Sequence, residues 1–535
     1  MILTWDIIRR TIEVLWIINI AFAVWTVFRS RRSVVATWAW MLVLTVLPGI
    51  GFILYLFFGR QLSHDEIFAI QEEQKKVQRH YLAEQRDMLK EHDLLPEKER
   101  LPRVRMLSEL NLNNDDAILT FDNQVKVFIS GPELFDQMIT DIKNAKKSVS
   151  LEFYTFYSNQ LGHRVLKALE EAAANGAKVR VIYDTSGSRG TKPSFFDHLR
   201  ELGGEAQPFI STSKKHWFTT PRLNYHLHRK LVIIDHHIGY IGGFNIGDQY
   251  VNKSPKFGHW RDTHLRVIGQ SPILMEVRFA MDWNTSIRRT NLPKFELKEL
   301  KPFTVNRKDI NDNKNVAMQL FPQDLIINIT ASDEAEGIIA GAKKYIYIQT
   351  PYLIPEESIL EALIIAANSG IDVRIMVPCM PDHPFVYRAT EYYAKYLVAH
   401  GVKVYKYNDG FIHAKTMVSG SNISSVGSAN QDFRSYTLNF EVNSFNYNPA
   451  LTQELKKIFE KDLGKCTLLT NDYFAQQSSW LKFKPILLKI IITYFFNEKP
   501  SIGLSDRDFT LYFKNAVFIS FTYFFIGYIM ITIKK

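Results

Sequence analysis

Two histidine–lysine pairs are the residues in this chain whose types and spacing could do chemistry. His228 and Lys230 lie in HLHRKLVIID, where Asp235 completes the spacing H-x-K-x4-D. His413 and Lys415 lie in FIHAKTMVSG, a second copy without the aspartate. A nucleophile or proton carrier beside a fixed cation suits attack on a phosphate diester. A lone histidine in a strand is more often structural, but a repeated pair favours a catalytic site.

Each pair is followed by a small-residue turn at the same distance. The apolar run at 231–234 predicts a strand, on which alternate side chains share a face. His228 and Lys230 then project together, whereas Asp235 points to the other side. The turns GGFN and GSAN begin 14 residues after the respective histidines. Equal spacing indicates that both copies build the same local structure.

The chemistry can be assigned to named side chains. The lysines hold phosphate oxygens, and three side chains of the turns donate hydrogen bonds to them, namely Asn245, Ser428 and Asn430. One histidine attacks phosphorus to give a phosphohistidine, while the other protonates the leaving alcohol and later deprotonates the acceptor. Each imidazole also needs a carboxylate on its far nitrogen. Asp262 and Glu441 are the candidates, and an ordinary surface acid is the evenly weighted alternative for each.

No metal or other cofactor is expected. The paired lysines would repel a cation, and no third soft ligand accompanies the two histidines. The only cysteines, Cys379 and Cys466, lack the spacing of a metal site and argue against a disulfide framework.

An internal repeat predicts the fold class. The segment ALEEAAANGAKVRVIYD at 168–184 aligns without gaps to ALIIAANSGIDVRIMVP at 362–378. Each copy predicts an amphipathic helix that stops at Gly176 or Gly370, followed by a buried strand. A basic pair opens the strand before each helix. Strand, helix and strand in this order predict an α/β protein with central mixed, mostly parallel sheets. Two repeats with half a site each suggest one active site at a pseudo-two-fold interface.

The composition favours an anionic partner. The chain has 535 residues, enough for about two or three domains, and 46% of them are apolar. Its net charge of +10 suits nucleic acid or an acidic lipid surface.

The first 60 residues predict a transmembrane helical hairpin. The apolar runs at 14–28 and 34–58 are close to or above the roughly 20 residues that span a bilayer. A cleaved signal peptide is the alternative for the first run, but no small-residue cleavage site follows it. Arginines flank both ends and the short connection, so charge leaves the orientation open. A third apolar run at 516–533 favours a further membrane association.

We expect six segments along the chain. They are the hairpin (1–60), a charged helical linker (61–115), the first repeat (116–290), a linker (291–330), the second repeat (331–492) and a tail with a possible membrane segment (493–535).

The paired H-x-K motifs with their G-[GS]-x-N tails resemble the phospholipase D superfamily. Further stretches resemble bacterial cardiolipin synthases: WAWMLVLTVLPGIGFILYLFFGR at 38–60, GYIGGFNIGDQY at 239–250, WRDTHLRV at 260–267, PDHPF at 381–385 and NFEVN at 439–443. The resemblance runs from the first apolar segment to about residue 490. The sequence departs from the family pattern at Gly420, where the family has aspartate, and in its tail.

The resemblance implies both an activity and a location. The expected reaction transfers a phosphatidyl group between two phosphatidylglycerols at the bacterial plasma membrane, giving cardiolipin and glycerol. The family's catalytic residues correspond to His228, Lys230, Asp235, His413 and Lys415. The catalytic part is expected to be cytoplasmic, and no nucleic acid partner is expected. Because Gly420 replaces the second aspartate, we interpret Asp235 as a structural brace.

Several alternatives remain open at this point. The same motif serves nucleases and phosphodiesterases, and a phospholipase would transfer the lipid phosphate to water. A non-catalytic membrane protein is a further alternative, although the intact second pair argues against it. The nucleophile could be either histidine, and the complete first motif favours His228.

Overall fold

The computed structural model describes residues 102–209, 226–287, 290–296, 315–323 and 331–477, with isolated positions before residue 88. The chain forms two compact units. One comprises Glu72–Ser211 and His226–Lys489, and it contains every residue predicted for the site. The other comprises Met1–Gln71, Thr212–Tyr225 and Ile490–Lys535. The predicted hairpin and tail therefore lie outside the described residues, apart from isolated positions.

No helix within the described ranges combines the length and the apolar composition needed to cross a membrane.

The first half of the larger unit alternates strands and helices. Its elements are α5 (Pro102–Asp115), β1 (Leu119–Phe128), α6 (Gly131–Lys143), β2 (Ser148–Phe153), α7 (Gln160–Ala174), β3 (Lys178–Tyr183), η3 (Pro193–Phe196), α8 (Asp197–Glu201), β4 (Glu205–Pro208), β5 (Lys230–Ile234), β6 (Ile238–Gly242), η4 (Asp248–Val251), β7 (Trp260–Arg261), β8 (His264–Ile268) and α9 (Ser271–Ser286).

The second half follows a similar plan. Its elements are β9 (Val316–Gln323), α10 (Ala331–Ala340), β10 (Tyr345–Gln349), β11 (Leu353–Ile354), α11 (Glu357–Asn368), β12 (Asp372–Pro378), α12 (Pro384–Ala399), β13 (Lys403–Tyr407), β14 (Phe411–Ile412), β15 (Thr416–Ser419), β16 (Ile423–Gly427), β17 (Gln431–Asp432), α13 (Phe433–Thr437), β18 (Glu441–Tyr447), α14 (Pro449–Leu463), β19 (Cys466–Leu468) and α15 (Asn471–Ala475).

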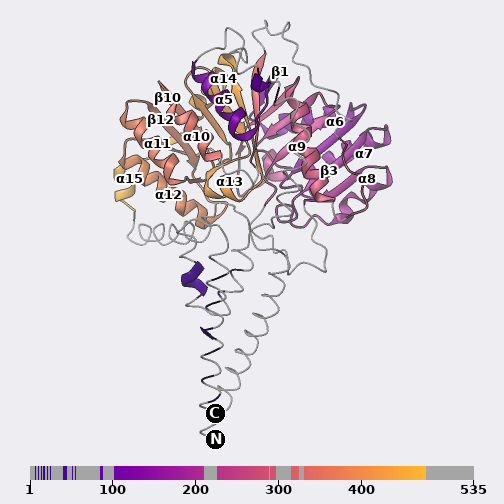
Figure 1. Cartoon of the computed structure of the whole chain (residues 1–535), viewed down its shortest axis with the longest axis horizontal. Coiled ribbons are helices and arrows are strands. Elements are labelled where there is room, and N and C mark those ends of the chain that lie inside the picture. The colour runs from indigo at the N-terminus through magenta and orange to yellow at the C-terminus, as the bar shows by residue number, and fades with distance from the viewer. Residues whose placement is uncertain are drawn as a thin grey trace. The chain divides into compact units, whose positions relative to one another are not determined.

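One continuous sheet joins the two halves. Among the described residues it has 15 strands in the order β19-β13-β12-β10-β15-β16-β18-β9-β1-β8-β6-β5-β2-β3-β4. Counted outward from the central β9–β1 pair, the strands of the two halves correspond one to one as far as β13 and β4. Figure 1 shows helices α6 to α9 around the first half and α10, α11, α12 and α15 around the second. The internal repeat of the sequence is therefore a repeat of topology.

The expectation of mostly parallel sheets is wrong. The parallel pairs of the large sheet are β2–β3, β3–β4, β10–β12 and β12–β13, and its remaining pairings are antiparallel. The β-α-β units are present, because helices α7 and α11 connect parallel strands. The H-x-K segments, however, form hairpins, β5–β6 and β15–β16, that run antiparallel to β2 and β10. Hairpins need only a short turn, whereas parallel neighbours need a crossover.

The two repeated helices end as the sequence predicts. Helix α7 begins after Asn159, whose side chain accepts a hydrogen bond from the backbone of Gly162. Gly176 then stands at φ +90°, and the corresponding Gly370 after α11 stands at φ +85°. A left-handed residue at this point ends a helix without the penalty that a Cβ would bring. The chain can then enter β3 or β12 directly.

The end of the predicted charged linker belongs to the folded unit. Helix α5 buries Leu107 and Leu112 completely. Asn111 in the same helix donates hydrogen bonds to Tyr447 (3.1 Å) and Gln319 (3.4 Å), on β18 and β9. A solvated linker up to residue 115 is therefore not what the structure shows, because the last turns of this segment carry an apolar face that the central strands cover.

Asp235 braces the first strand of its half. It stands at φ +52° in the β5–β6 turn, and its carboxylate accepts backbone hydrogen bonds from Lys146, Lys147 and Ser148 at 2.6–3.1 Å. Those hydrogen bonds lower the pKa of Asp235 against the opposing effect of partial burial. The carboxylate therefore fixes the start of β2.

Gly420 occupies the equivalent turn without a carboxylate. Its backbone N–H donates to Tyr345 (3.1 Å), just as that of Asp235 donates to Ser148 (2.9 Å). Gly420 stands at φ +61°, and a Cβ there would lie 3.0 Å from the end of the Arg103 side chain. That guanidinium donates to the backbone oxygen of Ser419 (3.3 Å). Arg103 is thus placed beside the position that an aspartate would fill.

We predict that Gly420→Asp stabilises the protein. The new carboxylate can accept from the backbone at the start of β10 and lie near Arg103, which is worth about 1 kcal/mol. The midpoint of thermal unfolding in detergent should rise by about 1 °C, with the reaction rate changed less than twofold. Gly420→Ala is the matched control and should lower the midpoint, because it adds a Cβ at positive φ without a carboxylate. A large gain in rate for Gly420→Asp would instead show that an aspartate at this position takes part in the reaction.

Candidate active site

Two short backbone pairings across the halves build the centre of the unit. Strand β14, which leads into His413, runs parallel to β7, which leads into Asp262. An isolated parallel bridge joins Leu227, before His228, to Phe440, before Glu441. The backbone N–H of His413 donates to Arg261 (2.7 Å), and that of His228 donates to Phe440 (2.9 Å). Each histidine is thereby set beside a carboxylate of the other half.

Each of the two imidazoles is hydrogen-bonded to one of these carboxylates through its Nδ1 atom. His228 Nδ1 lies 2.8 Å from Glu441, and His413 Nδ1 lies 2.7 Å from Asp262. Both carboxylates are fully buried, whereas the side chains of His228 and His413 keep 11% and 8% of their surface exposed. With Nδ1 oriented in this way, Nε2 is the nitrogen that remains for a substrate.

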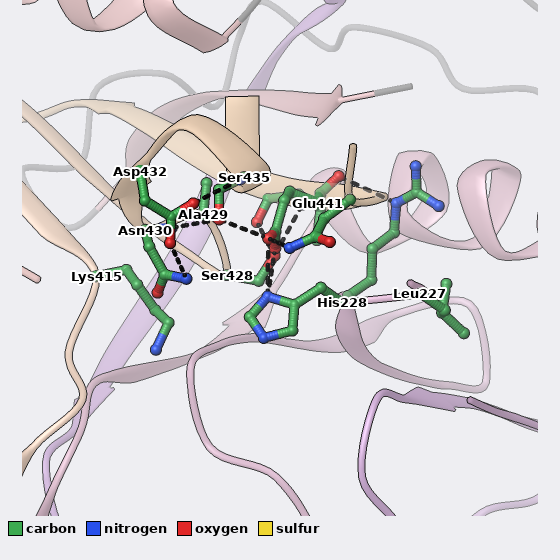
Figure 2. Close-up of polar contacts among 12 residues, drawn as sticks. Leu227, His228, Lys415, Ser428, Ala429, Asn430, Asp432, Ser435 and Glu441 are labelled. Atoms are coloured by element: carbon green, nitrogen blue, oxygen red, sulfur yellow. Dashed lines mark hydrogen bonds and ion pairs between the residues drawn. The ribbon is translucent and has the colours of Figure 1, made fainter. Parts of the chain in front are cut away.

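The two lysines lie next to the histidines. Lys230 Nζ donates to the backbone oxygen of His228 at 2.5 Å, and Lys415 Nζ donates to that of His413 at 2.5 Å. Lys415 Nζ also lies beside the His413 ring, 2.7 Å from Nδ1 and 3.0 Å from Nε2. In Figure 2 the side chains of Lys415 and His228 extend to the same side of the ribbon that carries Asn430. In addition to burial, the nearby charge of Lys415 lowers the pKa of Lys230, so two cations from opposite halves face one region.

Burial determines the protonation states of the two histidines and the two lysines. Burial, together with Lys230 and Lys415, lowers the pKa of His228 to about 4 against the opposing Glu441. Burial, then Lys415, lowers the pKa of His413 to about 4. Burial likewise lowers the pKa of Lys230 to about 7 and that of Lys415 to about 8. Both imidazoles are therefore neutral at pH 7, and the lysines hold their protons weakly until an anion arrives.

Each carboxylate is anchored by its own half. Glu441 accepts hydrogen bonds from Ser435 (2.9 Å) and Asn439 (3.1 Å), as Figure 2 shows for Ser435. Burial raises the pKa of Glu441, but His228 and Lys230 bring it below its ordinary value. Asp262 accepts from the backbone of Thr263 at 2.7 Å. A Cβ on Gly243 would lie 2.1 Å from the Asp262 carboxylate, so this approach requires glycine.

Comparison with known proteins identifies the family. A family model described as "Cardiolipin synthase, PLD-like domain" matches residues 138–255 and 337–463, and a "Phospholipase_D-nuclease N-terminal" model matches residues 17–60. A curated cardiolipin synthase of Listeria monocytogenes is 45% identical over 485 residues, covering 89% of this chain and 97% of the relative. One of Staphylococcus aureus is 40% identical over 476 residues, covering 88% and 93%. This chain belongs to the cardiolipin synthase family.

Family membership confirms the resemblance found in the sequence. The chain is an enzyme, a transferase of phospholipid synthesis within the phospholipase D superfamily. A solved phosphatidylserine synthase of Haemophilus influenzae has the same fold, with a TM-score of 0.55 at 16% identity over 72% of this chain and 99% of that one.

The turn residues predicted to bind phosphate differ in their surroundings. Asn245 accepts from the backbone of Thr155 through Oδ1 (3.1 Å), which leaves its amino group as the donor, and this side chain also hydrogen-bonds Tyr250. Asn430 donates to Asp432 through Nδ2 (3.2 Å). Ser428 is fully buried, and its hydroxyl exchanges hydrogen bonds with the backbone of Val442 at 2.9 and 3.3 Å. The Ser428 hydroxyl therefore has no donor left for a phosphate oxygen, because β18 uses both its donor and its acceptor.

The sequence alone did not single out several residues around the histidines. The ring of Tyr154 lies 5.0 Å from that of His228 and 5.5 Å from Lys230 Nζ. Arg229 donates to the backbone oxygen of Glu441 (3.1 Å) and to Asp282 (2.7 Å). Tyr154 follows the end of β2, and a polar residue at the carboxyl end of a parallel strand is the signal that would have found it.

Within the described ranges, no group of three or more histidine, cysteine, aspartate or glutamate side chains is arranged to hold a metal ion.

We predict that Glu441→Gln and Asp262→Asn each lower kcat by about 10²-fold or more. An amide no longer selects the Nδ1–H tautomer or stabilises a protonated imidazole, and acid–base assistance is typically worth about 10²–10⁴. The measurement is steady-state turnover of phospholipid in mixed micelles, at temperatures where thermal unfolding shows both variants folded. Asp136→Asn removes an exposed carboxylate and serves as the control. Losses below threefold would contradict a role for the two carboxylates in orienting the histidines.

Proposed function

We propose that this enzyme transfers a phosphatidyl group from one phosphatidylglycerol to another, producing cardiolipin and glycerol. The crosswise placement of two histidine–carboxylate pairs around two buried lysines is the observation that carries this proposal. The curated relatives, which match nearly the whole chain, bear the name cardiolipin synthase.

His228 acts as the nucleophile in the first step. Its neutral ring donates from Nδ1 to Glu441, so Nε2 carries the lone pair, and no described residue hydrogen-bonds to that atom. Nε2 attacks the phosphorus of the donor lipid, the bond from phosphorus to the glycerol oxygen breaks, and glycerol leaves with a proton from His413. The ammonium of Lys415 lies beside the His413 ring, 2.7 Å from Nδ1 and 3.0 Å from Nε2, and a cation so close makes His413 the poorer nucleophile of the two.

The second step reverses the roles of proton donor and acceptor. His413 accepts the proton from a hydroxyl of the second phosphatidylglycerol, whose oxygen attacks phosphorus. The bond from His228 Nε2 to phosphorus then breaks, and cardiolipin is released. In both steps the phosphoryl oxygens interact with Lys230 and Lys415 and with the amino group of Asn245.

The lysines favour an anionic substrate for a physical reason. Among the described residues neither ammonium forms an ion pair, and both are almost completely buried. A buried cation without a bonded counterion is destabilised. A phosphate diester supplies the missing negative charge, raises the pKa of both lysines and favours protonation of His413.

We propose that the enzyme acts at the bacterial plasma membrane, with its two pseudo-symmetric repeats on the cytoplasmic side. The two-helix transmembrane hairpin predicted for residues 1–60 would anchor it there, and the phospholipase D–nuclease N-terminal model matches residues 17–60. A lipid can then enter the site without leaving the bilayer.

The decisive experiment is turnover by the purified full-length protein in detergent micelles that contain phosphatidylglycerol. We expect cardiolipin and glycerol in equal amounts. When the wild-type enzyme turns over phosphatidylglycerol labelled with ³²P and is denatured rapidly during turnover, the label should be recovered on the protein. Peptide mapping then identifies the modified residue. A folded protein that yields no cardiolipin would overturn the proposal, and a label on residue 413 of the wild type would overturn its assignment of the nucleophile.

We also predict a bell-shaped dependence of kcat/KM on pH. The lowered pKa of His228 means that protonation removes the nucleophile only near pH 4. On the alkaline side the lysines lose their charge in the free enzyme from about pH 7 to 8, and kcat/KM reports the free enzyme. The first step also needs a proton on His413, whose pKa is about 4 in the free enzyme. The profile should therefore be highest at about pH 4–5, decline above it and fall more steeply above about pH 7. A constant value up to pH 10 would show that the lysine charge is not needed.

A further inference from the structure

The loop at 379–383 lies beside the second half of the site. It contains the PDH of the PDHPF stretch and connects β12 to α12. At its start, Cys379 Sγ lies 3.7 Å from the backbone oxygen of Gly410, three residues before His413. Tyr387 of α12 donates to the backbone oxygen of Cys379 at 3.0 Å. One end of the loop is therefore fixed next to the strand that delivers His413.

Tyr352 fixes the other end of the loop. Its hydroxyl donates a hydrogen bond to the carboxylate of Asp382. Thr350 Oγ1 donates to the backbone oxygen of Tyr352 (2.7 Å) and accepts from the backbone of Gln431 (3.0 Å). Strands β11 and β17 continue this contact in parallel register, with Leu353 opposite Gln431. Burial lowers the pKa of Lys415 and the charge of Asp382 acts against this effect, so the Asp382 carboxylate lies on the side of the site that carries Lys415.

Asn430 offers an acceptor in the same region. Its Nδ2 atom donates to Asp432, which fixes the orientation of the amide. The residue is 3% exposed, and its Oδ1 atom has no hydrogen-bond partner among the described residues. Figure 2 shows the Asn430 side chain extending to the same side as Lys415. A buried carbonyl oxygen without a donor is unfavourable unless a ligand supplies one.

The two halves therefore differ in what they offer to a substrate. Asn245 of the first half keeps an amino group, which suits a phosphate oxygen. The second half offers the Asn430 carbonyl oxygen and the Asp382 carboxylate, which are acceptors. A phosphate has no hydrogen to give to them, whereas a glycerol headgroup has hydroxyl donors.

We propose that Asp382, positioned by Tyr352, and Asn430 bind the glycerol hydroxyls of the acceptor lipid and so select a polyol over water as the attacking group. This inference rests on the proposed function. One hydroxyl of the headgroup donates to the carboxylate and holds the other near His413. His413 takes the proton of that second hydroxyl, its oxygen bonds to phosphorus, and the bond to His228 breaks.

The first test measures how the phosphoenzyme divides between lipid and water. Asp382→Asn in the full-length enzyme should lower the ratio of cardiolipin to phosphatidic acid about tenfold, as expected for loss of a hydrogen bond to a charged acceptor. Tyr352→Phe keeps the ring, removes the hydroxyl that holds Asp382 and should lower the ratio by a smaller factor. Because the donor's glycerol departs from the position that the acceptor's glycerol later fills, phosphoenzyme formation should slow as well in both variants, so the product ratio is the measurement that reports the choice of acceptor. Asp136→Asn again serves as the control for loss of a carboxylate.

A second test uses soluble alcohols as probes. Exchange of labelled glycerol into phosphatidylglycerol measures recognition of the headgroup alone, and transfer to 1-propanol measures recognition of an alcohol without neighbouring hydroxyls. The wild type should prefer glycerol, and Asp382→Asn should reduce that preference about tenfold. If either variant forms the phosphoenzyme normally with an unchanged product ratio and an unchanged preference, this inference is wrong while the proposed function stands. A wild type that forms no cardiolipin overturns the proposed function itself.

Discussion

The site depends on the way in which the two halves exchange short stretches of backbone. Strand β14 of the second half pairs with β7 of the first, and Leu227 of the first half pairs with Phe440 of the second. The histidine that follows each pairing therefore meets a carboxylate that belongs to the other half. His413 and Asp262, like His228 and Glu441, are therefore neighbours only when both halves are folded and docked. A half on its own would have a histidine and a lysine but no carboxylate on the imidazole. This constraint explains why the sheet runs unbroken from one half into the other.

Burial gives these residues their chemical properties. In water the lysines would be firmly protonated and the histidines would titrate close to neutral pH. In the site, removal of water lowers the pKa of all four groups, and the two carboxylates only partly oppose this effect. The empty site thus combines neutral imidazoles with cations that lack an ion-pair partner among the described residues. Such a site is electrostatically complementary to a phosphate diester, whose charge would restore the balance.

Repetition of the fold does not mean that the halves do the same work. Asp235 fixes the start of β2, whereas Gly420 leaves the start of β10 without a carboxylate and has Arg103 of α5 nearby. Arg229 connects Glu441 to Asp282 beside the first histidine, while the residue after the second histidine is Ala414. The asparagines of the two turns also present different atoms to a substrate, the amino group of Asn245 and the carbonyl oxygen of Asn430. These differences let a two-fold arrangement distinguish a donor lipid from an acceptor lipid.

The sequence by itself determined the features that depend on neighbouring residues. Hydrophobic periodicity predicted the repeated helix and strand, the glycines at 176 and 370 predicted where the helices stop, and the paired motifs predicted the histidines, lysines and family. Strand alternation also led to the interpretation of Asp235 as a brace, and its three backbone hydrogen bonds agree with a structural role. Each of these signals lies within a short stretch of sequence, where the local backbone geometry determines the secondary structure.

Only the tertiary structure decided which residues meet across the chain. Glu441 lies 213 residues from His228, and Asp262 lies 151 residues from His413, so no local pattern could assign the carboxylates to their histidines. The antiparallel hairpins, the packing of α5 on the central strands and the use of Ser428 by β18 likewise depend on which strands become neighbours. The sequence specified what each half contains, whereas the site arises between the halves, because long-range strand pairing is set by packing of the whole sheet.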